Sequence, residues 1–116
     1  MNLVEEFEVK NVKKLPYRGI DGLELESSSG TCMYLEYPSS IIKIPITVGN
    51  KVKISLSKVK DENYKVNWDI YMWGLVYYVS ERFVRISIGG LILELKNVDT
   101  SLEVGDRVYI GIKKLS

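Results

Sequence analysis

The chain has 116 residues, a formal net charge of +1 and no histidine, and 46% of its residues are hydrophobic. That length fits one domain with a sizeable core, and the composition is that of a globular protein rather than of a disordered segment. The even balance of charge excludes a strongly basic nucleic-acid-binding tail, and the absence of histidine and of a second cysteine removes the commonest zinc, disulfide and general-base chemistry.

The first half of the chain reads as short strands in which apolar and polar residues alternate, at residues 7–12, 23–26, 32–37, 41–46 and 51–59. The loop at residues 27–30 predicts a hairpin between the second and third of these strands. Pro45 marks the fourth as an edge strand or a bulge, because proline has no amide hydrogen to donate. Cys32 lies in an apolar run, which favours a small buried side chain over a reactive thiol.

The second half begins after the polar join at residues 60–65 and continues with four expected strands, at residues 69–79, 82–88, 91–96 and 107–113. Gly89-Gly90 lies between two alternating runs and indicates either a two-residue hairpin or a glycine bulge. No stretch with helical spacing is longer than about one turn. Short strands at this spacing predict a closed, all-β, single-domain antiparallel barrel.

One phrase, V-G-[N/D]-[K/R]-V-x-I-x-[L/I], occurs twice, at residues 48–56 and 104–112. Each copy reads as a turn followed by a strand, because glycine permits a positive φ and the Asn or Asp bonds its own backbone. Such a turn also occurs wherever a loop enters a barrel strand. We interpret the repeat as two matching halves, residues 1–60 and 68–116, each resembling an oligonucleotide/oligosaccharide-binding (OB) fold and both sharing one core.

Residues 70–79 are apolar on both faces, whereas a barrel strand should have one polar face. Either a partner protein or the amino-terminal segment is therefore expected to cover the outer face. Base stacking is another use for exposed aromatic side chains, but it normally interleaves them with Lys or Arg. The neighbours here are Leu, Val, Met and Gly, so protein docking is the better interpretation. Two basic clusters fit ordinary solvated faces: Lys10, Lys13, Lys14 and Arg18, and Lys51, Lys53, Lys58 and Lys60.

No catalytic constellation is recognisable. The acidic residues are scattered, no glycine-rich loop leads into a helix, and no carboxylate cluster has metal-binding spacing. We expect a non-enzymatic chain with no cofactor, no metal and no small-molecule substrate. The apolar run at residues 70–79 is too short to cross a membrane, and residues 1–7 lack the features of a signal peptide. An intracellular protein without a membrane partner is therefore expected.

Three segments in the second half occur in an order that resembles a known family: Ile70-Tyr71-Met72-Trp73-Gly74, Gly89-Gly90-Leu91-Ile92-Leu93 and Val108-Tyr109-Ile110 followed by basic residues. They resemble the eighth subunit of DNA-directed RNA polymerase, the small β subunit shared by the three eukaryotic nuclear polymerases. The family pattern is a Tyr-x-Met-Tyr-Gly strand, a Gly-Gly-Leu-Leu turn and a Val-Tyr-Leu strand. Residues 6–12 and 46–59 also match in character.

The short join at residues 60–67 departs from the eukaryotic members, which carry a long loop there, and is similar to the archaeal counterpart of that polymerase subunit. The resemblance implies a barrel of two OB-like halves and a non-catalytic role in transcription, cytoplasmic in an archaeal cell and nuclear in a eukaryotic one. The implied partners are the largest polymerase subunit and the rest of the assembly, with direct nucleic-acid contact not indicated. The matching docking positions are Tyr71, Trp73, Gly74, Gly89, Gly90 and Leu91. The alternative is a free-standing OB-type module that binds single-stranded RNA or DNA.

Overall fold

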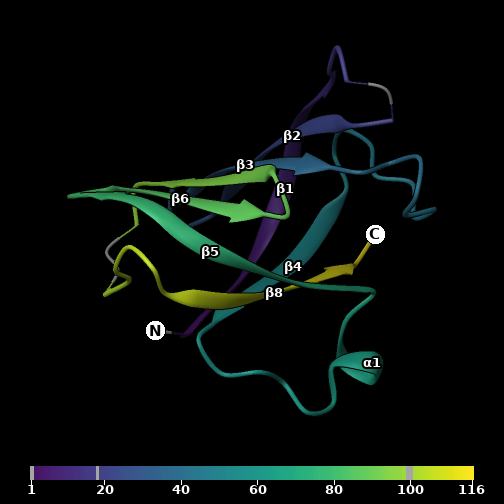
Figure 1. The fold of residues 1–116 in the computed structure, drawn as a ribbon. Helices are drawn as coiled ribbons and strands as arrows, with labels where there is room; N and C mark the ends of the chain where they lie inside the picture. The colour runs from purple at the N-terminus through teal and green to yellow at the C-terminus, as the bar shows by residue number, and fades with distance from the viewer. Residues whose placement is uncertain (1, 18, 99–100) are drawn as a thin grey trace.

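In the computed structural model, which describes residues 2–17, 19–98 and 101–116, eight antiparallel strands form one closed barrel (Figure 1). The strands are β1 (Asn2–Lys14), β2 (Asp21–Ser27), β3 (Cys32–Tyr37), β4 (Lys51–Ser57), β5 (Ile70–Ser80), β6 (Phe83–Ile88), β7 (Leu91–Lys96) and β8 (Arg107–Lys114). One helical turn, α1 (Tyr64–Asn67), lies in the join between β4 and β5. Around the barrel the strands follow the order β1-β2-β3-β7-β6-β5-β8-β4. The predicted all-β barrel is confirmed.

The core follows from alternation along each strand. In β4, Val52, Ile54 and Leu56 point inward and are almost fully buried, while Lys51 and Lys53 face solvent. Every strand contributes such inward residues to one cluster, because side chains at alternate positions fall on the same face of a sheet. Burial of this continuous apolar interior supplies the main driving force for folding.

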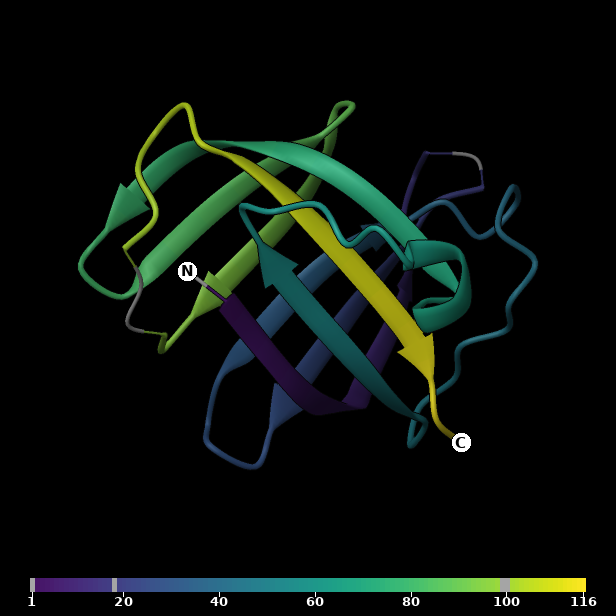
Figure 2. The ribbon, with the colours of Figure 1, turned by 90° about the horizontal axis from the view of Figure 1, so that it is seen from below.

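The barrel has an internal twofold pattern. Strands β1, β2 and β3 form a meander and β4 returns to pair with β1; β5, β6 and β7 form a second meander and β8 returns to pair with β5. The halves join where β3 meets β7 and where β4 meets β8. Figure 2 shows β4 and β8 side by side, with β5 on the other side of β8.

The two copies of the repeated phrase occupy equivalent places in these halves. A bulge follows Val9 in β1 and another follows Val76 in β5. The amide of Val9 donates to the carbonyl of Asn50 at 2.9 Å, and the amide of Val76 donates to the carbonyl of Asp106 at the same distance. Each Val carbonyl in turn accepts from the glycine of the phrase, Gly49 or Gly105, and both glycines have positive φ. The repeat therefore encodes one structural unit used twice.

Two expectations from the sequence are wrong. Residues 41–46 form no strand; they lie in a loop whose alternate isoleucines pack against the core, and Tyr37 Oη fixes this loop by donating to the carbonyl of Ile44 at 3.0 Å. Pro45, within this run, cannot donate to a ladder. Cys32 is only half-buried, because Met33 and Leu35 take the inward positions of β3 and leave Cys32 on the outer side. Of the two interpretations of Gly89-Gly90, the structure shows the hairpin, with φ of +58° and +97°.

Candidate docking site on the outer face of β5 and β8

The outer face of β5 is apolar and exposed. Trp73 is 51% exposed, and Leu75 and Tyr77 are each 44% exposed, whereas Ile70 and Val76 on the other face are buried in the barrel. Strand β1 pairs with β2 and β4 and does not lie over β5. Cover by the amino-terminal segment is therefore wrong, and no described segment buries these three side chains.

Strand β8 completes this face. Tyr109 lies directly opposite Trp73 in the ladder, and Arg107 lies opposite Leu75. The guanidinium carbon of Arg107 lies 4.4 Å from the centroid of the Trp73 ring, which is a cation–π contact. An exposed tryptophan, a tyrosine and an arginine thus lie together on two neighbouring strands.

Further tyrosines extend the arrangement toward the join. The ring of Tyr71 stacks on Tyr109 with centroids 6.1 Å apart, and the ring of Tyr64 from α1 stacks on Tyr71 with centroids 5.1 Å apart. The Lys60 ammonium lies 5.1 Å from the Tyr64 ring. We call Tyr64, Tyr71, Tyr109 and Trp73 the aromatic row. A shallow hollow over the row has no carboxylate in its lining, which consists of the row together with Lys60, Met72 and Arg107.

Asp61 holds the join over the barrel. Its carboxylate accepts hydrogen bonds from Asn67 Nδ2, from the Asn63 amide and from Trp68 Nε1, all at 2.8–3.0 Å. These three donors, with Asn67 the largest contributor, lower the pKa of Asp61 below its ordinary value. The Asp61 amide donates to Tyr71 Oη at 2.8 Å. Asp61 therefore orders the join through its carboxylate and ties it to the aromatic row through its backbone amide.

Gly111 explains how Trp68 lies flat on β8. The Trp68 ring covers Gly111 so closely that an added Cβ would overlap the indole. The ammonium of Lys53, from β4, lies 5.7 Å from the same ring. Gly111, in the second copy of the repeat, thus makes room for the Trp68 ring of the join. The first copy has Ser55 at the equivalent position.

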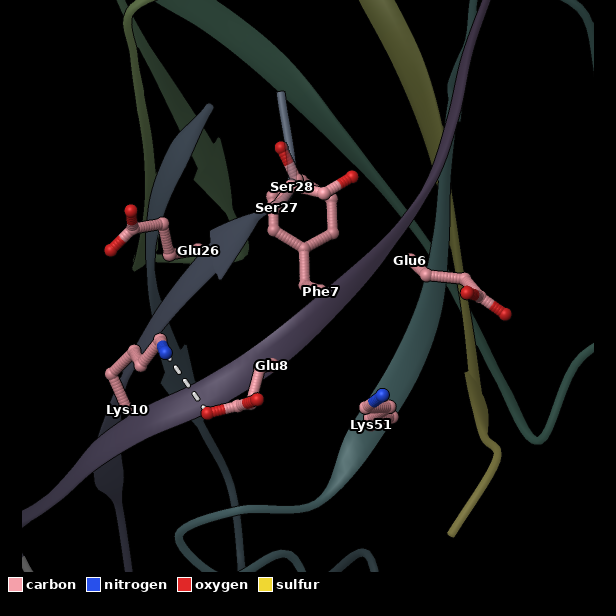
Figure 3. Close-up of a pocket in the computed structure, with 8 residues that line it drawn as sticks. All are labelled: Glu6, Phe7, Glu8, Lys10, Glu26, Ser27, Ser28 and Lys51. Carbon is pink, nitrogen blue, oxygen red and sulfur yellow. Dashed lines mark hydrogen bonds and ion pairs between the residues drawn. The ribbon is translucent and has the colours of Figure 1, made fainter. Parts of the chain in front are cut away.

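The internal twofold supplies a comparison for this face. Glu6 lies opposite Lys53 and Glu8 lies opposite Lys51, at the positions equivalent to the Trp73–Tyr109 and Leu75–Arg107 pairs. Figure 3 shows the hollow on this first-half face, with its carboxylates and lysines and the 2.9 Å ion pair between Lys10 and Glu8. That pair lowers the pKa of Glu8 and raises the pKa of Lys10. The same place in the fold is therefore charged in one half and aromatic in the other.

Of the six predicted docking residues, Tyr71 and Trp73 line the hollow over the row. Tyr71 and Trp73 belong to the aromatic row. Gly74 is buried, and an added Cβ would lie 2.7 Å from the carbonyl oxygen of Ser87, so barrel packing alone requires glycine there. Gly89 and Gly90 form the β6–β7 turn, with Leu91 half-buried just after it.

Four residues that line the hollow were not predicted as docking residues, because each lies outside residues 70–79: Tyr64, Tyr109, Lys60 and Arg107. One signal was present: Arg107 and Tyr109 alternate with inward residues in the second copy of the repeat. Of the basic clusters, Lys13 pairs with Glu24 at 2.8 Å and Lys14 with Asp21 at 3.1 Å, while Arg18 lies outside the described residues.

Among the described residues, no group of His, Cys, Asp or Glu side chains could hold a metal ion. Within the same residues, no helix is long and apolar enough to span a membrane. The chemistry that the site does offer is aromatic contact area with two flanking cations.

No protein-family model matches the chain, and no curated protein matches its sequence. Solved structures do match, among them the cytoplasmic molybdate-binding protein ModG in a form with molybdate bound. That likeness covers 96% of this chain and 89% of the ModG chain, at 14% sequence identity and a TM-score of 0.39. At those values it carries no argument about what this chain binds.

Proposed function

We propose that this chain is a non-catalytic subunit of a multisubunit DNA-directed RNA polymerase and docks on the largest subunit through the outer face of β5 and β8. The resemblance of three ordered segments to the eighth polymerase subunit motivates the proposal, and it implies the two-half barrel that the fold has. The subunit would act where the polymerase acts, in the cytoplasm of an archaeal cell or in a eukaryotic nucleus.

One observation carries the docking role. The fold tolerates Glu6 and Glu8 on the outer face of β1, so nothing in barrel geometry demands Trp73 and Leu75 at the equivalent positions of β5. A single exposed apolar side chain is ordinary, whereas several that lie together, as Trp73, Leu75 and Tyr77 do, mark an interaction surface. Trp, Tyr and Arg are also the residue types that contribute most at protein interfaces.

A second candidate is the free-standing module that binds single-stranded RNA or DNA. It is favoured by Lys60 and Arg107, which place cations at the two ends of the aromatic row. Against it, the rings of Tyr64, Tyr71 and Tyr109 stack on one another, so several of the flat faces that bases need are already covered. The net charge of +1 also offers little to a phosphate backbone.

Co-purification separates the two candidates. The tagged chain is purified from its native cell at low and at high salt, without nuclease, and the recovered proteins and nucleic acids are identified. Recovery of the large polymerase subunits in equal amounts supports the subunit. Recovery of the chain alone, or of RNA that is lost as salt rises, contradicts it and supports the nucleic-acid module, because phosphate contacts weaken steeply with salt.

A further inference from the structure

The cations beside the aromatic row have no carboxylate partner among the residues that the structure describes. Neither Arg107 nor Lys60 forms an ion pair with any described acidic residue, and both lie over aromatic rings instead. In the first half, Lys51 holds the place of Arg107 and has Glu8 directly opposite. Glu8 forms its ion pair with Lys10, and Leu75 stands at its place in β5, so no carboxylate lies opposite Arg107 in the ladder.

Three aspartates in the segments that adjoin the row are engaged in other contacts. Asp106 forms an ion pair with Lys58 at 3.1 Å, and Asp69 accepts from the Lys114 amide at 2.8 Å. Asp61 belongs to the join, and its carboxylate accepts a hydrogen bond from Trp68 Nε1. The hollow is therefore lined by rings and by two cations that these carboxylates do not neutralise.

We propose that the aromatic row receives an acidic segment of the partner protein, whose carboxylates pair with Arg107 and Lys60 while its apolar side chains cover Trp73. This inference rests on the proposed docking function and specifies the chemistry of the bound surface. Arginine pairs with carboxylates through two parallel hydrogen bonds, and the Arg107 guanidinium already lies over the Trp73 ring at this face. A protein partner is favoured over nucleic acid because three rings of the row stack on one another, which leaves fewer ring faces open for bases.

The test uses the full tagged chain in its native cell. Three forms are compared: the wild type, the double variant Arg107→Glu with Lys60→Glu, and the control Lys51→Glu at the position equivalent to Arg107. All three changes lie on exposed side chains, and melting temperatures check that the proteins are folded. The double variant should recover at least roughly tenfold less of the largest polymerase subunit, since like charges replace opposite ones at the interface. Lys51→Glu should recover as much as the wild type.

Carbodiimide treatment of the wild-type complex then identifies the contact, because this reagent joins a lysine amine only to a carboxylate close to it. A cross-link from Lys60 to Asp or Glu in a carboxylate-rich segment of the partner supports the proposal. If the wild type and the double variant recover the same amount of the largest polymerase subunit, the proposal of an acidic segment is overturned, whereas the proposed subunit role is not. A wild type that brings no polymerase overturns both. Loss of the partner on nuclease treatment, or cross-linking of the row to RNA, assigns the surface to nucleic acid instead.

Discussion

At the scale of single residues, Trp73 is the side chain that decides the docking role. It is half exposed, so its replacement removes little from the core. We expect Trp73→Ala to weaken docking by about 2 kcal/mol, or roughly 30-fold, because interface tryptophans are frequent anchors. The matched control is Glu6→Ala, at the equivalent position of β1. Binding is measured on purified components and stability by thermal unfolding; unchanged binding in a folded Trp73→Ala protein removes Trp73 from the interface.

Gly74 illustrates the opposite case, a residue matched by a docking motif but required by packing. A Cβ at this position would lie 2.7 Å from both the Ser87 carbonyl oxygen and the Ile86 Cγ2. Gly74→Ala should therefore lower the free energy of unfolding by about 1–3 kcal/mol, the usual cost of overpacking a core. Leu75→Ala, whose side chain faces outward, should change it by less than about 0.5 kcal/mol. Urea denaturation of both variants measures the difference, and equal stability would show that β5 and β6 can separate without cost.

At the scale of elements, the join between β4 and β5 depends on one ionised carboxylate. Three donors lower the pKa of Asp61, so the charged form is the one that holds the join. The stabilisation is complete at pH values above the ordinary Asp pKa of about 3.9 and is lost as the pH falls through the lowered value. We expect the Trp68 emission to change over that acidic range in a Trp73→Phe background.

The same background with Asp61→Asn provides the comparison. The Asn side chain has no negative charge and binds the three donors more weakly than the carboxylate does. This variant should therefore show, already at neutral pH, the Trp68 emission that the Trp73→Phe protein shows only in acid. Faster amide exchange across residues 60–69 should accompany it. A Trp68 signal that responds to acid equally in both proteins would mean that another group holds the join.

Local patterns predict the elements of this fold well where each strand carries its own signal. Alternation in β4 and the glycine turn before it were sufficient, whereas Gly89-Gly90 placed the break between β6 and β7 but allowed either a hairpin or a bulge. Residues 41–46 show the limit, because they alternate like a strand but have no strand beside them to pair with. Local patterns identified only two members of the aromatic row, Tyr71 and Trp73: Tyr64 and Tyr109 join it because the barrel places α1 and β8 beside β5.

At the scale of the whole molecule, the two halves share one interior, and neither closes a barrel alone. The contacts between β3 and β7 and between β4 and β8 bury apolar residues from both halves, including Ile54 and Ile112, which face each other. Separated at the join, each half would expose that interior and two open strand edges. We expect residues 1–60 and residues 61–116 to be unfolded when expressed separately and to fold together when mixed.

The composition of the core further predicts that a first half associates with a second half in preference to another copy of itself. Phe7 and Gly74 occupy equivalent positions, opposite Val52 and Val108, so the shared core contains a large ring on one side and none on the other. A barrel of two first halves would bring two Phe7 rings into that space, and one of two second halves would leave a cavity; both are costly. Circular dichroism and sedimentation of the mixed fragments should show a folded one-to-one complex. A stable homodimer of either fragment would mean that the twofold pattern alone, without this complementarity, is enough to close the barrel.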